Sequence, residues 1–240
     1  MAGPVPPPTH PLLPLPRRPL ARESRESRAS QEGGGGGDDV RGWYENELGW
    51  ATVPGHPVRL LTGERFDVLD VPAAAGHAAL RRLTAATAAT AATAAATTAP
   101  AGFPVSLHGR SASPHGHTAD GTRMRLLVAA GAAEELPGIL QWLEWGALPL
   151  DLTAIGASAF MEAPPPPAFR RPPRAGPLQG AAEWVRPPVA GCEVESSLPT
   201  MSALGAPGGA PDLVRLVNTL ATECHRVRLR RACAQPLAFS

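Results

Sequence analysis

The stretch Arg65–Ala73, RFDVLDVPA, combines a short apolar run with two aspartates. A run this brief, rich in apolar and β-branched residues and closed by Pro72, predicts a buried strand rather than a helix. Buried parallel strands tolerate a carboxylate mainly at their carboxyl end, where α/β folds place ligand sites. Asp70 stands at that end and is therefore a candidate site residue. The alternative, which this stretch alone leaves equally open, is that Asp67 and Asp70 only cap or flank the strand.

Outward from this strand, short apolar runs alternate with helical patterns. Apolar runs bounded by proline or glycine predict strands at 50–53, 58–61, 103–107 and 123–129. Residues 150–155 and 159–163 predict a hairpin across Gly156-Ala-Ser, ended by a run of prolines. Apolar residues spaced three or four apart predict helices at 40–48, 73–83, 134–145 and 211–231. The pattern is typical of an α+β fold with a small mixed β-sheet and flanking helices.

Composition divides the chain into three parts. Residues 1–39 are rich in proline and glycine, which predicts a disordered tail; a Pro-rich ligand for an aromatic-lined groove is the alternative. Residues 40–205 form the expected folded domain, with an Ala/Thr-rich insertion at 84–101. The threonines of this insertion recur at every third residue, which does not match the helical period of 3.6 residues, so they form no stripe. Residues 206–240 hold the C-terminal helix and a basic tail.

Charge and cysteine content exclude several classes of protein. The formal net charge is +1, so no global field draws nucleic acid or membrane to the chain, and such binding would need a local patch. The three cysteines lack C-x-x-C spacing, which argues against a disulfide scaffold or a zinc knuckle and favours a reducing cytoplasm. No apolar run approaches the roughly 18–20 residues of a membrane span. We therefore expect a cytoplasmic protein that does not bind membranes.

Two further clusters each leave two interpretations open. The Gly/Ser-rich segment 108–121 contains His108, His115 and His117. It is either a solvated loop, which we favour, or a structural metal site. Arginines gather at the end of the C-terminal helix, at Arg226, Arg228, Arg230 and Arg231. They either complement the helix dipole, which we again favour, or contact phosphate.

Several phrases of the sequence resemble the primase–polymerase domain of the archaeo-eukaryotic primase superfamily, in particular the actinobacterial proteins labelled bifunctional DNA primase/polymerase. The phrases occur in the family's order and are LLTGERFDVLDVPAAAG, RMRLLVAAGAAEELPGILQWLEWGALPLDLTAIG, AFMEAPPPP, GCEVESSLPTMSALG and APDLVRLVNTLATECHRVRLRRA. The similarity covers residues 43–240 apart from the Ala/Thr-rich insertion. It implies a small mixed sheet that holds nucleotide and metal on its surface.

The resemblance also implies a chemistry, phosphoryl transfer from a nucleotide to a 3′-hydroxyl with two Mg²⁺ or Mn²⁺ ions. The family's acid-x-acid strand places two carboxylates on one face, where both grip the metal pair. Asp70 matches the first acid and Asp151 the aspartate of a later motif, whereas the second acid falls on Pro72. Asp67 is no substitute, because residues three apart on a strand face opposite sides. The family's phosphate-binding histidine falls on Arg125, whose guanidinium can still hold a phosphate.

These departures predict a catalytically degenerate domain that binds nucleotide or nucleic acid in a replication-related or regulatory role. The two matched aspartates and the arginine would line its remnant pocket. The alternative is an active DNA primase or polymerase, in which Glu64, Asp67 or Glu162 supplies the missing carboxylate. Glu162 is the preferred substitute ligand because the predicted hairpin holds it near Asp151. A third interpretation is a protein-interaction module that uses the Pro-rich tail or the C-terminal helix.

Overall fold

The computed structural model describes residues 35–94, 102–109, 121–169, 182–191, 194–201 and 212–234. The chain divides into two compact units, residues 1–36 and 37–240, and the described residues belong almost entirely to the second. The predictions for the tail at 1–34, for the Ala/Thr-rich segment 95–101, and for His115 and His117 fall outside the described residues. Within the described ranges, no helix is both long and apolar enough to cross a membrane.

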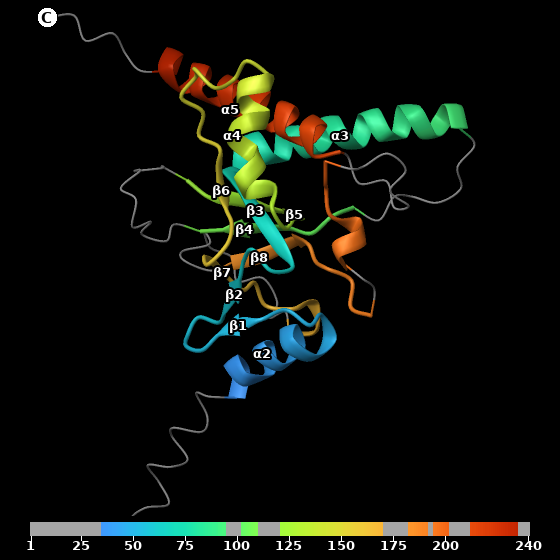
Figure 1. The fold of residues 1–240 in the computed structure, drawn as a ribbon, viewed down its shortest axis with the longest axis vertical. Helices are drawn as coiled ribbons and strands as arrows, with labels where there is room; N and C mark the ends of the chain where they lie inside the picture. The colour runs from blue at the N-terminus through green and yellow to red at the C-terminus, as the bar shows by residue number, and fades with distance from the viewer. Residues whose placement is uncertain are drawn as a thin grey trace, which may run out of the picture. The chain divides into compact units, whose positions relative to one another are not determined.

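The second unit is built on a five-stranded antiparallel sheet in the order β6-β3-β5-β4-β8 (Figure 1). Its strands are β3 (Phe66–Pro72), β4 (Val105–His108), β5 (Arg123–Ala129), β6 (Thr153–Ile155) and β8 (Ala182–Arg186). A smaller antiparallel sheet joins β1 (Thr52–Val53), β2 (Arg59–Leu61) and β7 (Phe160–Glu162). Every residue of β3 is buried, as the apolar run predicts. The α+β class is confirmed, with two antiparallel sheets in place of one mixed sheet.

Two details of the predicted strand arrangement are wrong. β3 pairs antiparallel with both β5 and β6. Asp70 therefore does not lie at the carboxyl edge of a parallel sheet. Residues 150–163 form no hairpin, because β6 pairs with β3 while β7 pairs with β2 in the other sheet. At the turn between them, Thr62 Oγ1 donates a hydrogen bond to the Gly156 carbonyl over 2.6 Å, and Ser158 has a φ of 61°. This anchored turn directs β7 away from β6.

Three helices cover one face of the five-stranded sheet: α3 (Ala73–Ala94), α4 (Ala132–Trp142) and α5 (Leu213–Ala234) (Figure 1). Gly76 lets α3 approach the sheet closely, because a Cβ there would lie 2.3 Å from Met124 Sδ. The first part of the Ala/Thr-rich insertion continues α3, and the Thr87 hydroxyl donates to the Leu83 carbonyl over 2.9 Å. The predicted apolar face of α5 is buried in the core, with Leu213, Leu216, Val217, Leu220 and Cys224 each at most 1% exposed.

The helix α4 is shorter than its apolar pattern predicts. It ends at Trp142, whose side chain is 72% exposed, although the spacing placed this residue on the apolar face. The chain leaves the helical conformation directly afterwards, since Glu144 has a φ of 63°. Trp145 then turns back toward α5, and its Nε1 donates to Asn218 Oδ1 over 3.0 Å. The second tryptophan, not the first, therefore joins the two helices.

Aromatic residues lie on the other face of the sheet, and one of them, Trp184 of β8, is hydrogen-bonded to Tyr44 of α2 (Gly35–Glu47). The rings of Trp50 and Phe66 lie 4.6 Å apart. Trp184 Nε1 on β8 donates to the Tyr44 hydroxyl over 2.9 Å, and Tyr44 donates to the Pro164 carbonyl over 2.5 Å. Burial raises the pKa of the Tyr44 phenol, so the group stays a donor. Because α2 begins at Gly35, the last residues of the predicted tail are helical.

Candidate functional site

Register across three strands gathers polar side chains on the sheet face opposite the helices. Asp70 on β3 stands across from Arg125 on β5, and Arg125 stands across from Ser106 on β4. Two residues along the same strands, Arg123 stands across from His108. Residues two apart on a strand, and residues directly opposite on neighbouring strands, share a face. Antiparallel register therefore brings together five polar side chains that are far apart in the sequence.

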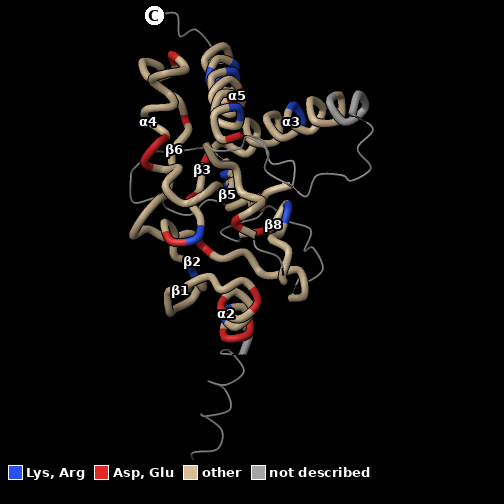
Figure 2. Tube along the Cα trace, turned by 45° about the vertical axis from the view of Figure 1, so that its right-hand side comes forward, with Lys and Arg blue, Asp and Glu red and all other residues tan. Residues whose placement is uncertain are grey.

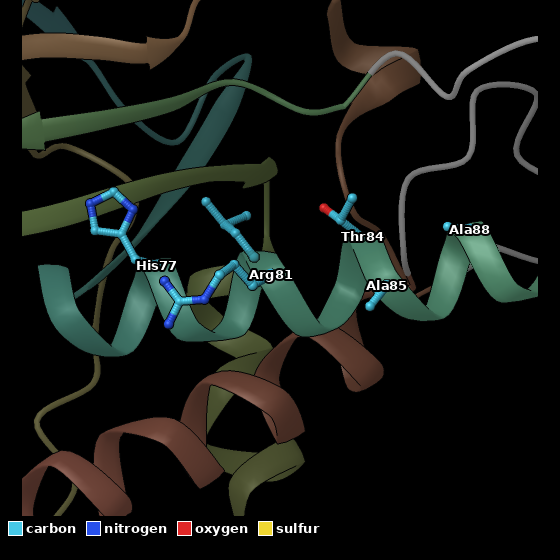
Figure 3. A pocket seen from close by; sticks show the side chains of 6 residues that line it. His77, Arg81, Thr84, Ala85 and Ala88 are labelled. Carbon is cyan, nitrogen blue, oxygen red and sulfur yellow. The ribbon is translucent and has the colours of Figure 1, made fainter.

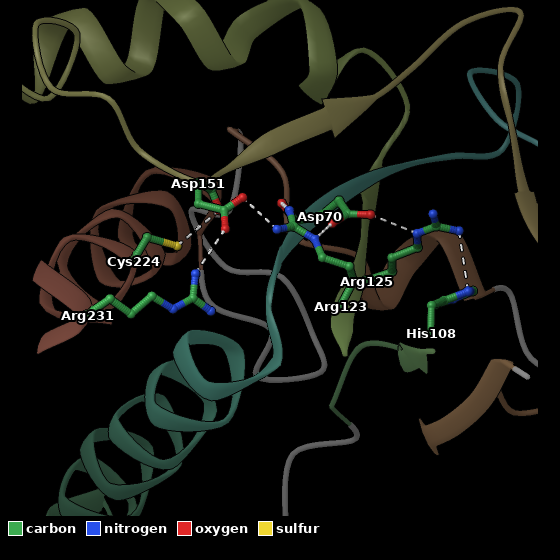
Figure 4. A network of polar contacts seen from close by, with 7 residues as sticks. All are labelled: Asp70, His108, Arg123, Arg125, Asp151, Cys224 and Arg231. Carbon is green, nitrogen blue, oxygen red and sulfur yellow. Dashed lines mark hydrogen bonds and ion pairs between the residues drawn. The ribbon is translucent and has the colours of Figure 1, made fainter. Parts of the chain in front are cut away.

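Both carboxylate oxygens of Asp70 are bound by arginines (Figure 4). Oδ1 accepts from Arg123 Nε, and Oδ2 accepts from Arg125 Nε over 2.9 Å. Arg123 also donates through Nη2 to the backbone carbonyl of Asp70 over 3.0 Å. The Asp70 side chain is 9% exposed and each arginine side chain 19%. Charge-assisted hydrogen bonds are stronger than those between neutral groups, so this largely buried cluster has a fixed geometry.

Arg123 also joins Asp70 to Asp151, which lies between α4 and β6. Its Nη1 donates to Asp151 Oδ1 over 2.5 Å, while Arg231 of α5 approaches Asp151 Oδ2 at 3.9 Å. Burial acts to lower the pKa of Arg123, but the carboxylates of Asp70 and Asp151 outweigh it and raise that pKa. The structure thus brings together the two aspartates that the sequence singled out. A permanent cation lies between them.

His108 belongs to this cluster and not to a solvated loop, which corrects the interpretation of the sequence. Its Nδ1 lies 3.3 Å from Arg125 Nη1, and its Nε2 lies 2.9 Å from Ser106 Oγ. Because arginine only donates, Nδ1 must accept, and the neutral ring carries its proton on Nε2 toward Ser106. Burial and the nearby Arg125 charge lower the pKa of His108 to about 3. His108 is therefore a neutral acceptor that orients Arg125.

Glu162 lies on β7, in the smaller sheet, and not on a hairpin beside Asp151. Burial raises its pKa, against the opposing effects of a backbone hydrogen bond from Ala182 and of the Arg125 charge. Glu162 is thus close enough to Arg125 to interact with it electrostatically. Within the described residues, no three side chains of His, Cys, Asp or Glu gather closely enough to hold a metal ion. The role of Glu162 as a substitute ligand stays a prediction.

The acidic residues of the first motif have separate surroundings. Asp67 lies on the helix-covered face, where its Oδ2 accepts from the Ala133 backbone N–H at the start of α4 over 2.9 Å. Its Oδ1 is buried and has no partner among the described residues. Pro72, where the sequence resemblance would place a second acid, stands directly across from Arg123. Asp67 and Asp70 therefore face opposite sides of the sheet, as the spacing predicts.

Cys224 contacts the cluster only through the backbone. Its thiol lies 3.6 Å from the Asp151 carbonyl oxygen, and the residue is 1% exposed. Burial, followed by the Asp151 charge, raises the pKa of the thiol to about 12. A thiol that stays protonated is a poor nucleophile. Cys224 is accordingly a packing residue, as the helical pattern of α5 predicts.

A separate open groove runs along α3 and contains none of these residues (Figure 3). It is lined by His77, Leu80, Arg81, Thr84, Ala85 and Ala88. All of these come from a single helix, whereas binding sites usually converge polar groups from several elements on a hollow. We assign no role to this groove.

Two members of the cluster, Arg123 and Ser106, were not singled out from the sequence, and His108 was considered only as part of a loop or a metal site. Arg123 could have been found, because it precedes Arg125 by two residues and so shares its face. His108 follows an apolar strand, but the glycine and serine after it favoured a loop. Only the β4–β5 register reveals that it contacts Arg125.

Comparison with other proteins adds no further constraint. No family model, no curated protein and no solved structure matches the chain. The resemblance to primase–polymerase domains therefore stays a prediction from the sequence phrases.

Proposed function

We propose that this chain is a primase–polymerase-like domain that has lost metal-dependent nucleotidyl transfer and that binds nucleotide or nucleic acid through Arg125. One observation carries the proposal: the guanidinium of Arg123 lies between the carboxylates of Asp70 and Asp151. In a two-metal site, divalent cations would bridge such carboxylates. Here a side chain of the protein supplies the positive charge.

The donor set does not fit Mg²⁺ or Mn²⁺. These hard cations need carboxylate oxygens free to enter a compact coordination shell. Both oxygens of Asp70 accept from arginines, and one oxygen of Asp151 accepts from Arg123. A divalent ion at this position would have to displace a guanidinium that holds two carboxylates. We therefore derive no reaction step through a metal.

Arg125 supports the binding part of the proposal. It uses Nε for Asp70 and Nη1 for His108, and its Nη2 has no hydrogen-bond partner among the described residues. The side chain is 19% exposed, so part of it is open to a ligand. A fixed guanidinium with free N–H groups is well suited to a phosphate oxygen. A cytoplasmic location belongs to the same proposal, since Cys224 and Cys233 are free thiols.

Two assays test the two parts. Primer synthesis and extension with Mg²⁺ and then Mn²⁺ should give no incorporation by the wild type. Template-dependent incorporation that is lost in both Asp70→Asn and Asp151→Asn would contradict the loss of catalysis.

Calorimetric titration with a nucleoside triphosphate tests binding. The Arg125→Gln variant should bind at least about tenfold more weakly, since a hydrogen bond to a charged group contributes roughly 1.5–3 kcal/mol. The matched control is Arg65→Gln, which removes an exposed arginine whose only ion pair with a described residue is that with Glu195 at 3.3 Å. Equal affinities for Arg125→Gln and wild type, or no binding by the wild type, would overturn the proposal.

A further inference from the structure

The helix α5 carries a line of arginines on the side that faces away from the core. At about 100° per residue, Arg215, Arg226 and Arg230 fall within about 60° of one another around the helix axis. Arg215 and Arg230 are exposed and Arg226 is partly exposed. Figure 2 shows basic positions along α5, beside those of α3. The buried apolar residues of the helix, among them Val217 and Leu220, occupy the opposite side, whereas Leu229 lies near the arginines and is 50% exposed.

Arg82 extends this line from the neighbouring helix α3. Arg82 Nε and Arg226 Nη1 both bind Glu223 Oε1, at 2.8 Å and 2.9 Å. The Glu223 side chain is 4% exposed, whereas those of Arg82 and Arg226 are 53% and 42% exposed. One buried carboxylate therefore holds two guanidinium groups at the surface in a fixed arrangement. It can neutralise only one of their charges.

We propose that Arg82, Arg215, Arg226 and Arg230, together called the arginine stripe, bind the phosphate backbone of nucleic acid. This surface is distinct from the Arg125 cluster. The four arginines exceed the two acidic residues beside them, Glu223 and the α5 capping residue Asp212, by two charges, on a chain whose formal net charge is only +1. Such a local surplus is the electrostatic footprint of a polyanion site.

The dimensions of the stripe suit a nucleic-acid backbone. From Arg215 to Arg230 the helix rises roughly 22 Å at 1.5 Å per residue. That length corresponds to about six base pairs at 3.4 Å per step. The stripe's guanidinium groups are suited to phosphate oxygens, and contacts of this kind position a duplex or strand without reading its sequence.

A helix-dipole role and a membrane-binding role both fit the stripe less well. The helix dipole favours cations near the C-terminus, which accounts for Arg230 but not for Arg215 in the first turn. An anionic membrane surface requires a helix with an exposed apolar face beside its basic one. In α5 the apolar face is buried against the sheet and its partner helices, although Leu229 is 50% exposed. The regularly spaced phosphate groups of a nucleic-acid backbone account for all four arginines of the stripe.

The experiment measures fluorescence anisotropy of labelled single-stranded and duplex oligonucleotides with the full chain over a range of salt concentrations. The test variant is the double substitution Arg215→Gln with Arg230→Gln, because neither guanidinium has a partner among the described residues. Each lost phosphate contact should reduce the slope of log K against log salt by roughly 0.7–0.9. We expect a slope smaller by about 1.5 and an affinity lower by about tenfold near 0.1 M salt.

The matched control is Arg59→Gln with Arg65→Gln, which removes the same charge from β2 and the loop after it. This control should keep the wild-type slope. Equal slopes for wild type and stripe variant, or no oligonucleotide binding by the wild type, would overturn the proposal. If the stripe variant lost binding to anionic lipid vesicles as strongly as it lost binding to oligonucleotides, the surface would be assigned to membranes. That result would also overturn the proposal.

Failure of this proposal is distinguishable from failure of the nucleotide site. The stripe variant should bind a nucleoside triphosphate as the wild type does, because the Arg125 cluster is intact. Arg125→Gln should lower the salt slope for oligonucleotides by no more than one contact, roughly 0.7–0.9, because it leaves all four arginines of the stripe in place. A stripe variant that loses nucleotide and oligonucleotide binding together would contradict a separate surface.

Discussion

Asp67 and Asp70 lie three residues apart on one strand, but their side chains lie on opposite faces of the sheet and have different partners. Asp67 faces the helices, accepts one backbone N–H of α4 and leaves its other oxygen without a partner among the described residues. Asp70 faces the other way, and two arginines bind its two oxygens. Both carboxylates are buried. The difference shows that burial alone does not define a site: converging groups from other strands do.

Removing the Asp70 charge should have the largest effect on stability. Asp70→Asn leaves Arg123 and Arg125 without their common carboxylate, and loss of one partner from a buried ion pair costs roughly 3–5 kcal/mol. Because each arginine is 19% exposed, we expect the lower end, about 3 kcal/mol. Urea unfolding of wild type and variant measures the change. A cost below about 1 kcal/mol would mean that water compensates the two guanidinium groups.

The free energy of unfolding should depend on pH through His108, the neutral hydrogen-bond acceptor on the same face of the sheet as Asp70. The pKa of His108 is about 3 in the folded protein, against an ordinary value near 6.5 in the unfolded chain. Between these values the unfolded chain binds a proton that the folded chain does not. Stability is therefore present above pH 6.5 and is lost as the pH falls, at up to roughly 1.4 kcal/mol per unit.

The variant His108→Gln isolates this dependence, because glutamine does not titrate. Its free energy of unfolding should vary less between pH 6.5 and pH 5 than that of the wild type, by up to about 1.4 kcal/mol per unit. Equilibrium unfolding at several pH values checks this. If the free energies of unfolding of the two proteins varied with pH in parallel, His108 would take up a proton in the folded protein as readily as in the unfolded chain.

Removing the Arg123 guanidinium should turn the pair of aspartates into a cation site. In Arg123→Ser, Asp70 and Asp151 lose the positive charge between them, so Mn²⁺ should stabilise the variant and not the wild type. At a concentration ten times the dissociation constant the gain would be about 1.4 kcal/mol. Thermal unfolding with and without Mn²⁺ measures it, with Arg65→Gln as the control. Equal Mn²⁺ effects on all three proteins would show that Arg123 does not take the place of a cation.

The smallest effect is expected for Asp67→Asn. An asparagine oxygen can still accept the Ala133 N–H, but in a weaker hydrogen bond without a charge, while an uncharged amide NH2 replaces the buried oxygen that has no partner among the described residues. These changes oppose each other, so we expect stability to shift by less than about 1 kcal/mol. Urea unfolding beside Asp70→Asn gives the contrast directly. A loss as large as that of Asp70→Asn would show that the Asp67 charge itself stabilises α4.

Local patterns allowed much of the fold to be predicted. The apolar run of β3 and the helical spacing of α5 correspond to buried elements. The hairpin prediction failed because the turn at Gly156 is held by Thr62, a contact between distant segments. The end of α4 was placed too late because apolar spacing continues through Trp145, while the backbone leaves the helix after Trp142.

The sequence by itself determined that Asp67 and Asp70 face opposite sides, because a strand alternates every two residues. It also determined the buried face of α5, because helical spacing depends only on near neighbours. Tertiary structure alone decided that Arg123 lies between Asp70 and Asp151, and that His108 supports Arg125. These contacts depend on the register of β3, β4 and β5, which is set when segments from distant parts of the chain pack together.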